Sequence, residues 1–343
     1  MQLIRGYLRE AGRTGLDGWN RFWFSPADPA TLGLIRILAG AMLLYTHAVW
    51  TLGLNDFFGP EAWVSPQAAS LAQPDNGRFA WTYFWPIGST AMLWLVHIAG
   101  LVVFTMLTLG LFSRVVAVLA YLAAVAYVNR VPGALFGLDQ INCLLAMYLM
   151  IGPSGDAYSL DRLRLPRAAD GSRPPALPST SANLAIRLIQ VHMCVIYFFA
   201  AMGKLRGDSW WAGNAMWLSV ANLEYQSWDV TWLAHWPIIS ALTTQVTVYW
   251  ELFFCVLVWP RLTRPLVLAL AVPVHLGIAL FMGMITFGLI MLVGCLSFVP
   301  PWFVRLVLER RQPNGVSEGD GATRGRTESR RPRAGLASGR RSA

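Results

Sequence analysis

The sequence predicts an all-α, polytopic transmembrane helix bundle of about eight spans. Three observations support this fold class. The chain of 343 residues is 55% hydrophobic and only 13% charged, whereas soluble globular chains average about 25% charged residues. Its mean hydropathy is +0.47. Apolar runs of about 20 residues recur along it, and that is the length with which a helix crosses a bilayer. A soluble protein is therefore excluded.

Eight apolar segments are expected to cross the membrane as helices, because a helix satisfies its own backbone hydrogen bonds inside lipid. They are the stretches 32–53, 90–112, 114–129, 134–152, 184–204, 238–259, 265–283 and 285–300. The third and the eighth segments are the shortest, so their signal for spanning is the weakest.

The basic residues predict on which side of the membrane each loop lies. With eight spans and both termini in the cytoplasm, 21 of the 27 lysines and arginines fall in cytoplasmic segments and four fall outside. Positive residues concentrate on the cytoplasmic side of membrane proteins. An odd number of spans would move one set of terminal arginines to the other side, so the sequence predicts two cytoplasmic termini.

The chain divides into three regions by composition. Residues 1–24 are expected to form an amphipathic helix at the membrane interface, and residues 25–305 the transmembrane bundle. Residues 312–343 are rich in Arg, Gly and Ser and are expected to be disordered. Within the bundle, residues 207–237 carry six tryptophans and are too polar to span, which is typical of the aromatic belt at a membrane surface.

The net charge of +9 comes mostly from loops and the tail. Membrane orientation accounts for it, so no nucleic-acid partner is expected. The four cysteines all lie in apolar runs without a C-x-x-C pair, which indicates packing residues and no metal site. The partner that this composition requires is the lipid bilayer.

Lys204 is the one lysine of the chain, at the end of a long apolar run. Arginine stays charged in a protein, whereas a poorly solvated lysine amine can lose its proton and act as a base. Ionisable groups inside membranes are candidates for function. The alternative is that Lys204 extends from a helix end to the interface as an anchor.

Five ionisable side chains from five predicted spans share the outer half of the bilayer. Each costs free energy if it faces lipid, about 2.5–3.5 kcal/mol for Asp or Lys at mid-depth. They are therefore expected to share a polar pocket that opens outward, or else to make separate packing contacts. These five residues are His47, His97, Asp139, Lys204 and His275. Glu251 lies nearer mid-membrane, as a protonated structural acid or a counter-ion.

The fifth span has a polar face. Gln190, Tyr197 and Lys204 are seven residues apart and so lie on one side of a helix. Ala200 and Ala201 are small enough to let a neighbouring helix or a flat ligand approach the amine.

Four stretches resemble the HTTM family, the membrane domain shared by vitamin K-dependent γ-carboxylase and many bacterial proteins. The most specific is IYFFAAMGKLRGDSWWAGNAM at 196–216, which is similar to a carboxylase segment Y-F-x-A-G-x-K-K-L-x-x-D-W-x-x-G. SPADPATLGLIRILAG at 25–40, LGLFSRVVAVL at 109–119 and HLGIALFMGMITFGLIM at 275–291 are similar to other parts of the family domain. The resemblance implies a multi-pass protein of a cell membrane, the inner membrane in a bacterium.

The resemblance implies that Lys204 is a general base. In the carboxylase, the matching lysine takes a proton from a quinol, reduced vitamin K, so a lipid-soluble quinol such as this or menaquinol is the expected cofactor or substrate. Gly203 and Pro132 replace a lysine and a histidine of the carboxylase, which argues against carboxylation of a peptide.

Two functions follow as hypotheses. The first is a membrane enzyme, with carboxylase-like lyase or quinol-linked oxidoreductase chemistry. Its catalytic residues would be Lys204, His275 and Asp139, and its pocket residues Gln190, Tyr197, His47, His97 and Glu251. The second is a non-catalytic membrane protein that binds a lipid or a transported molecule, or a periplasmic or secreted partner protein.

Overall fold

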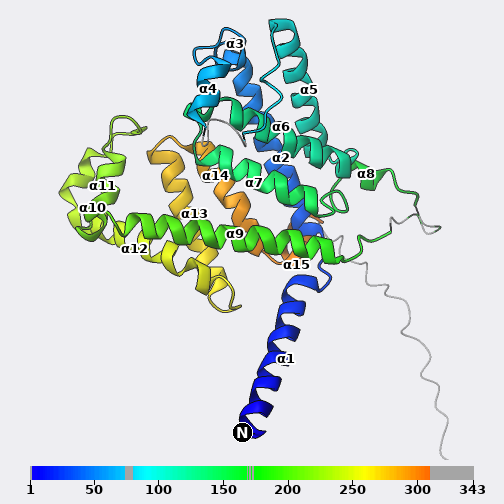
Figure 1. Ribbon diagram of the computed structural model, residues 1–343. Coiled ribbons are helices and arrows are strands. Elements are labelled where there is room, and N and C mark those ends of the chain that lie inside the picture. The colour runs from blue at the N-terminus through cyan, green and yellow to red at the C-terminus, as the bar shows by residue number, and fades with distance from the viewer. Residues whose placement is uncertain (1, 74–79, 168, 170, 172–173, 310–343) are drawn as a thin grey trace, which may run out of the picture.

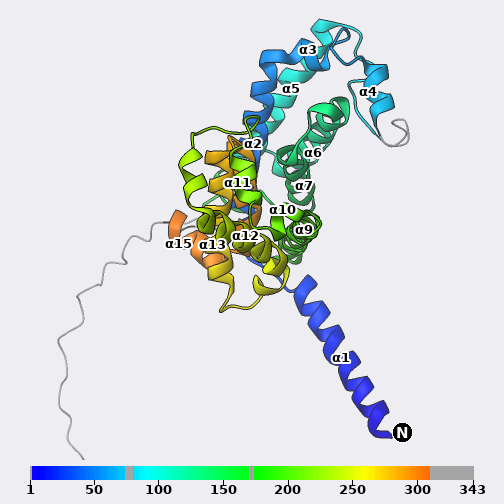
Figure 2. The same cartoon turned by 90° about the vertical axis from the view of Figure 1, so that its left-hand side faces the viewer.

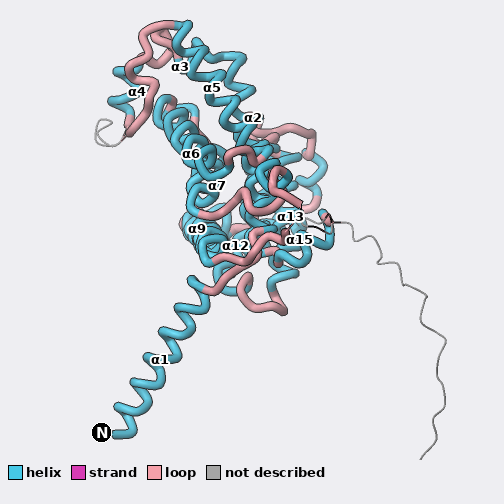
Figure 3. The backbone as a smooth tube through the Cα atoms, turned by 90° about the vertical axis from the view of Figure 1, so that its right-hand side faces the viewer, coloured by secondary structure: helices cyan, strands magenta, loops and turns pink. Residues whose placement is uncertain are grey.

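The computed structural model describes residues 2–73, 80–167, 169, 171 and 174–309, and this part of the chain is a helical bundle (Figure 1). Loops join the helices (Figure 3), and one isolated antiparallel bridge joins Ala27 to Ser179. The α-helices are α1 Gln2–Phe24, α2 Ala30–Trp50, α3 Leu54–Phe58, α4 Pro66–Ala72, α5 Thr90–Leu109, α6 Ser113–Arg130, α7 Gly137–Ile151, α8 Leu160–Leu163, α9 Thr180–Lys204, α10 Asp208–Trp211, α11 Ala215–Val220, α12 Pro237–Leu257, α13 Arg264–Phe281, α14 Ile285–Cys295 and α15 Pro301–Leu308. Short 3₁₀ turns are η1 Thr51–Gly53, η3 Pro132–Ala134, η4 Thr231–His235 and η5 Leu296–Phe298.

The all-helical membrane fold is confirmed, with six to seven candidate spans where the sequence predicts about eight. Six helical segments of the described residues are long and apolar enough to cross a membrane: Ala30–Phe58, α5, α6, α9, α12 and α13. The fourth predicted span is α7, which has only 15 residues. The eighth is a bent pair, in which Ile285–Phe298 and Pro301–Leu308 meet at 117°. Counted as one span, this pair is the seventh.

The N-terminal segment forms the predicted helix, α1, which extends away from the bundle (Figures 1 and 2). Leu8, Leu16 and Trp19 on it are all more than half exposed. Its location at a membrane interface stays a prediction, as do the sidedness of the termini and the boundaries of the three regions. The predicted disordered tail, 312–343, lies outside the described residues.

Among the described residues, α2 and α7 contribute to both of the two largest apolar clusters. The larger cluster joins them to α9, α12, α13 and α14, and the smaller one joins them to α5 and α6. Helices α9 and α12 pack against each other, as do α13 and α14. The bundle thus has two halves, each with its own set of polar side chains inside.

Buried Arg36 connects the end of α5 to the loop after α7. Its guanidinium donates to the carbonyl oxygens of Leu107, Thr108, Ser154 and Tyr158. Carbonyl groups at the end of a helix lack the usual partner within it, so this side chain supplies donors to Thr108 and, outside the helix, to Ser154 and Tyr158.

Two features of α13 and α14 position His275. Pro273 lies inside α13, where it removes one backbone hydrogen bond and favours a local bend. Gly288 of α14 lies so close to α13 that a Cβ atom there would be 2.4 Å from the carbonyl oxygen of His275. A residue larger than glycine at 288 would force the two helices apart.

Candidate functional site

Lys204 is the last residue of α9, and its amine pairs with a carboxylate of α12. Nζ donates to Oε2 of Glu251 at 2.6 Å. The Lys204 side chain is 23% exposed and that of Glu251 is 8% exposed. The amine also lies 5.3 Å from the ring centre of Trp210, within range of a cation–π interaction. The sequence left the role of Glu251 open, and the structure makes it the counter-ion of Lys204.

A large apolar cavity opens beside this ion pair. Its volume is about 640 Å³, within the range of about 300–1,000 Å³ that is typical of small-molecule sites. Its walls come from α11, η4, α12, α13 and the start of α14, and Lys204 and Glu251 are part of its lining. An apolar cavity with few convergent polar groups is suited to a lipid-soluble molecule that carries one polar end.

Three polar side chains form a separate buried group behind the cavity wall. Tyr197 of α9 shares a hydrogen bond of 2.6 Å with Nε2 of His275 on α13, and its hydroxyl lies 3.3 Å from Sγ of Cys295 on α14. Nδ1 of His275 is buried without a hydrogen-bond partner among the described residues. None of these three residues lines the cavity.

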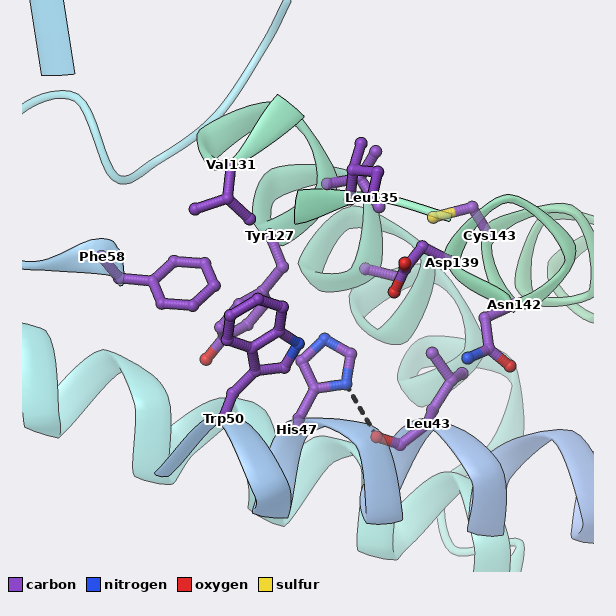
Figure 4. A pocket seen from close by; sticks show the side chains of 12 residues that line it. Leu43, His47, Trp50, Phe58, Tyr127, Val131, Leu135, Asp139, Asn142 and Cys143 are labelled. Carbon is purple, nitrogen blue, oxygen red and sulfur yellow. Dashed lines mark hydrogen bonds between the residues drawn. The ribbon is translucent and has the colours of Figure 1, made fainter. Parts of the chain in front are cut away.

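Other predicted site residues lie in the second half of the bundle (Figure 4). His47 of α2 and Asp139 of α7 line a much smaller cavity, together with Tyr127 of α6. His97 of α5 hydrogen-bonds to the Tyr127 hydroxyl at 2.6 Å and to the Thr51 hydroxyl at 2.9 Å. These three predicted residues therefore group together, but around a different cavity from that of Lys204.

Gln190 is the remaining predicted pocket residue. It lies on the buried face of α9, as the seven-residue spacing indicates, but its amide nitrogen donates to the carbonyl oxygen of Ser297 and its amide oxygen accepts from Arg187. The bond from Gln190 to Ser297 connects α9 to η5. Gln190 does not line either cavity.

Further polar residues, which were not predicted as site residues from the sequence, line the large cavity. Thr243 and Thr247 of α12 line it together with Glu251. The three residues are four apart, so they lie on one face of the helix. This spacing was the available signal in the sequence. Among the described residues, no group of His, Cys, Asp and Glu is arranged to hold a metal ion.

Comparison with known families identifies one match. The model of the HTTM domain matches residues 24–302, which is most of the chain and includes Lys204, Glu251 and the lining of both cavities. No curated protein and no solved structure matches the chain.

Proposed function

Because the chain belongs to the HTTM family, whose domain is related to the membrane domain of vitamin K-dependent γ-carboxylase, we propose that it is a membrane enzyme with Lys204 as its base. The substrate would be a lipid-soluble quinol, or another small membrane-soluble molecule with an acidic hydroxyl group. The single observation that carries the proposal is the Lys204–Glu251 pair in the lining of an apolar cavity of about 640 Å³.

The cavity suits a ring with an apolar tail. Val246, Leu270, Ile278 and Phe287 are among its apolar lining residues, and burial of apolar surface against them contributes about 25 cal/mol per Å². The polar end of the ligand would lie at the Lys204–Glu251 pair. In this orientation the hydroxyl group of the ligand lies next to the Lys204 amine, while the rest of the ligand contacts apolar side chains.

The ion pair supplies a route for the proton. Charge separation is less favourable in an apolar cavity than in water, so the neutral pair lies closer in free energy to the charged pair there. When a proton passes from Lys204 to Glu251, the amine gains a free lone pair. Lys204 then takes the proton of the substrate hydroxyl, and its ammonium group stabilises the oxygen anion that results.

The same ion pair supports a second candidate function, in which the protein binds a lipid-soluble molecule without reaction. Nζ and Oε2 are only 2.6 Å apart, and a lysine held in such a pair is a charged anchor for a polar head group. Under this reading, Lys204 and Glu251 would bind the ligand, and no proton would be transferred.

Lys204→Arg separates the two functions. Arginine keeps the positive charge and the pairing with Glu251, but it does not act as a base near neutral pH. A reduced naphthoquinone with a short isoprenoid tail is the probe. Its binding is measured by quenching of tryptophan fluorescence, since Trp210 and Trp232 line the cavity. Its consumption is measured by absorbance in liposomes.

For an enzyme, we expect Lys204→Arg to bind the probe within about tenfold of the wild-type affinity and to lose a factor of about 10²–10⁴ in rate. Arg206→Lys is the matched control, because Arg206 is exposed and lies outside the cavity lining. An unchanged rate in Lys204→Arg would refute the role as base. Binding by the wild type without consumption above the uncatalysed rate would select the second function.

A further inference from the structure

The small cavity in the other half of the bundle has a size and a set of polar groups that suggest a specific occupant. It offers about 10 Å³ of space to the centre of a water molecule, which is close to the requirement for one bound water. Its lining includes side chains of α2, α6 and α7, most of them buried. It is independent of the Lys204 cavity, and neither the family relationship nor the proposed function assigns it a ligand.

Asn142 is the first observation that points to a ligand. Its side chain lines this cavity and is 2% exposed, and neither its amide oxygen nor its amide nitrogen has a hydrogen-bond partner in the part of the chain that the structure describes. A buried polar group left unpaired costs about 1–3 kcal/mol. Two unpaired atoms on one buried amide therefore indicate an additional group in the cavity.

His47 supplies a second, independent observation. Its Nδ1 lies 2.7 Å from the carbonyl oxygen of Leu43. A carbonyl oxygen only accepts, so Nδ1 carries the proton and Nε2 of the neutral ring is an acceptor. Figure 4 shows this second ring nitrogen directed away from α2, toward the side of the cavity where Asp139 lies. In the part of the chain that the structure describes, the hydrogen bond of His47 is made by Nδ1, which leaves Nε2 as an acceptor toward the cavity.

Asp139 presents acceptors to the same space. Its Oδ2 accepts a hydrogen bond from the backbone N–H of Phe136 at 3.1 Å, at the start of α7. A carboxylate only accepts, so Asp139 and the Nε2 atom of His47 cannot bond to each other directly. Among the described residues, no hydrogen bond joins any two of His47, Asp139 and Asn142. Tyr127 and Cys143 also line the cavity, and the Tyr127 hydroxyl already bonds to His97.

We propose that this cavity binds one water molecule, which bridges His47 of α2 to Asp139 and Asn142 of α7. The water donates one hydrogen to Nε2 of His47 and the other to the Asp139 carboxylate, and it accepts from the Asn142 amide. Three hydrogen bonds are the usual number for a buried water. The water converts three side chains without mutual contacts into one hydrogen-bonded unit, which connects α2 to α7 inside the membrane.

A double-mutant cycle tests the bridge. Asn142→Leu removes the amide at similar volume, and His47→Phe retains a ring against Phe104 and Tyr127, which His47 contacts. With the water present, each single variant lowers the equilibrium constant for folding at least tenfold in detergent micelles. The double variant loses much less than the product of the two effects, because both changes remove the same water.

Asn183→Leu is the matched control, since the Asn183 amide donates to backbone carbonyl oxygens at the end of α1, away from this cavity. When Asn183→Leu is combined with His47→Phe, the equilibrium constant should change by the product of the two single effects, because the two sites are independent. A dry cavity would give the opposite results: Asn142→Leu would be neutral or stabilising, because it removes an unpaired amide, and the two effects would multiply. A high-resolution experimental map of the wild type decides the matter if a variant does not fold: density for a water beside all three side chains supports the bridge, and an empty cavity overturns it.

Discussion

The Lys204–Glu251 pair should show a large energetic coupling, because one partner is buried and the other is partly exposed. The perturbations are Glu251→Gln and Lys204→Met, made singly and together. Each single change leaves the remaining partner without its counter-charge, whereas the double change removes both charges. The cycle therefore measures the interaction itself.

The structure sets the magnitude of this coupling. At a separation of 2.6 Å and an effective dielectric constant of about 20, the attraction is about 6 kcal/mol. Removing Glu251 from water offsets several kcal/mol, and water screens part of the attraction because Lys204 is 23% exposed. We expect a net coupling of about 2 kcal/mol. Lys204→Met should lower the free energy of unfolding by about 3 kcal/mol, and the double variant should lower it by no more than this single variant does.

The measurement is reversible unfolding by SDS in mixed micelles, followed by circular dichroism. The pair of Arg305 and Asp28 is the comparison, since both side chains are about 30% exposed and solvent screens such a pair more than one with a buried partner. If the effects of Glu251→Gln and Lys204→Met add to within about 0.5 kcal/mol, the two side chains do not pair, and both the catalytic and the binding proposals lose their basis.

Three further predictions concern single side chains, each checked by the same unfolding assay. Arg36→Met should cost about 3 kcal/mol, because it leaves the carbonyl oxygens of Thr108, Ser154 and Tyr158 without this donor. Tyr197→Phe should cost about 1–3 kcal/mol, since it removes the hydroxyl that pairs with His275; equal stability would show that this hydrogen bond is absent. Burial alone would raise the pKa of Asp161, but hydrogen bonds from Ser113 and Phe112 hold it below its ordinary value. The stabilisation from Asp161 should therefore be complete at neutral pH and be lost as the pH falls below about 4. Asp161→Asn should lower stability at pH 7 by about 1 kcal/mol and remove this acid dependence.

Much of the fold follows from local features of the sequence. The apolar runs 90–112, 184–204 and 238–259 correspond to α5, α9 and α12 to within a few residues. The seven-residue spacing on α9 correctly placed Gln190 and Tyr197 on its buried face. The sequence predicts about eight spans, and six to seven segments of the described residues are candidates, because α7 has only 15 residues and the chain bends between η5 and α15.

The candidate site depended on contacts that local pattern does not encode. Lys204 is predictable as a site residue because it is the one lysine in an apolar chain. Its partner, Glu251, is 47 residues away in the sequence, and the two side chains meet only because α9 packs on α12. The ionisable residues predicted to share one pocket are separated in the structure: Lys204 lines the large cavity, His47 and Asp139 line the small one, and His97 and His275 line neither. Asn142 was not selected, since nothing in its neighbourhood distinguishes an unpaired amide from a paired one.

The sequence by itself determined that this protein is a helical membrane protein of the HTTM family, and that its single amine lies at the end of a membrane helix. Hydrophobicity and the 3.6-residue period are properties of short segments, and lipid requires each spanning segment to satisfy its own backbone. The tertiary structure alone decided which polar groups meet. That outcome depends on how each helix is rotated and which helices it packs against, and these are set by side chains far apart in the chain.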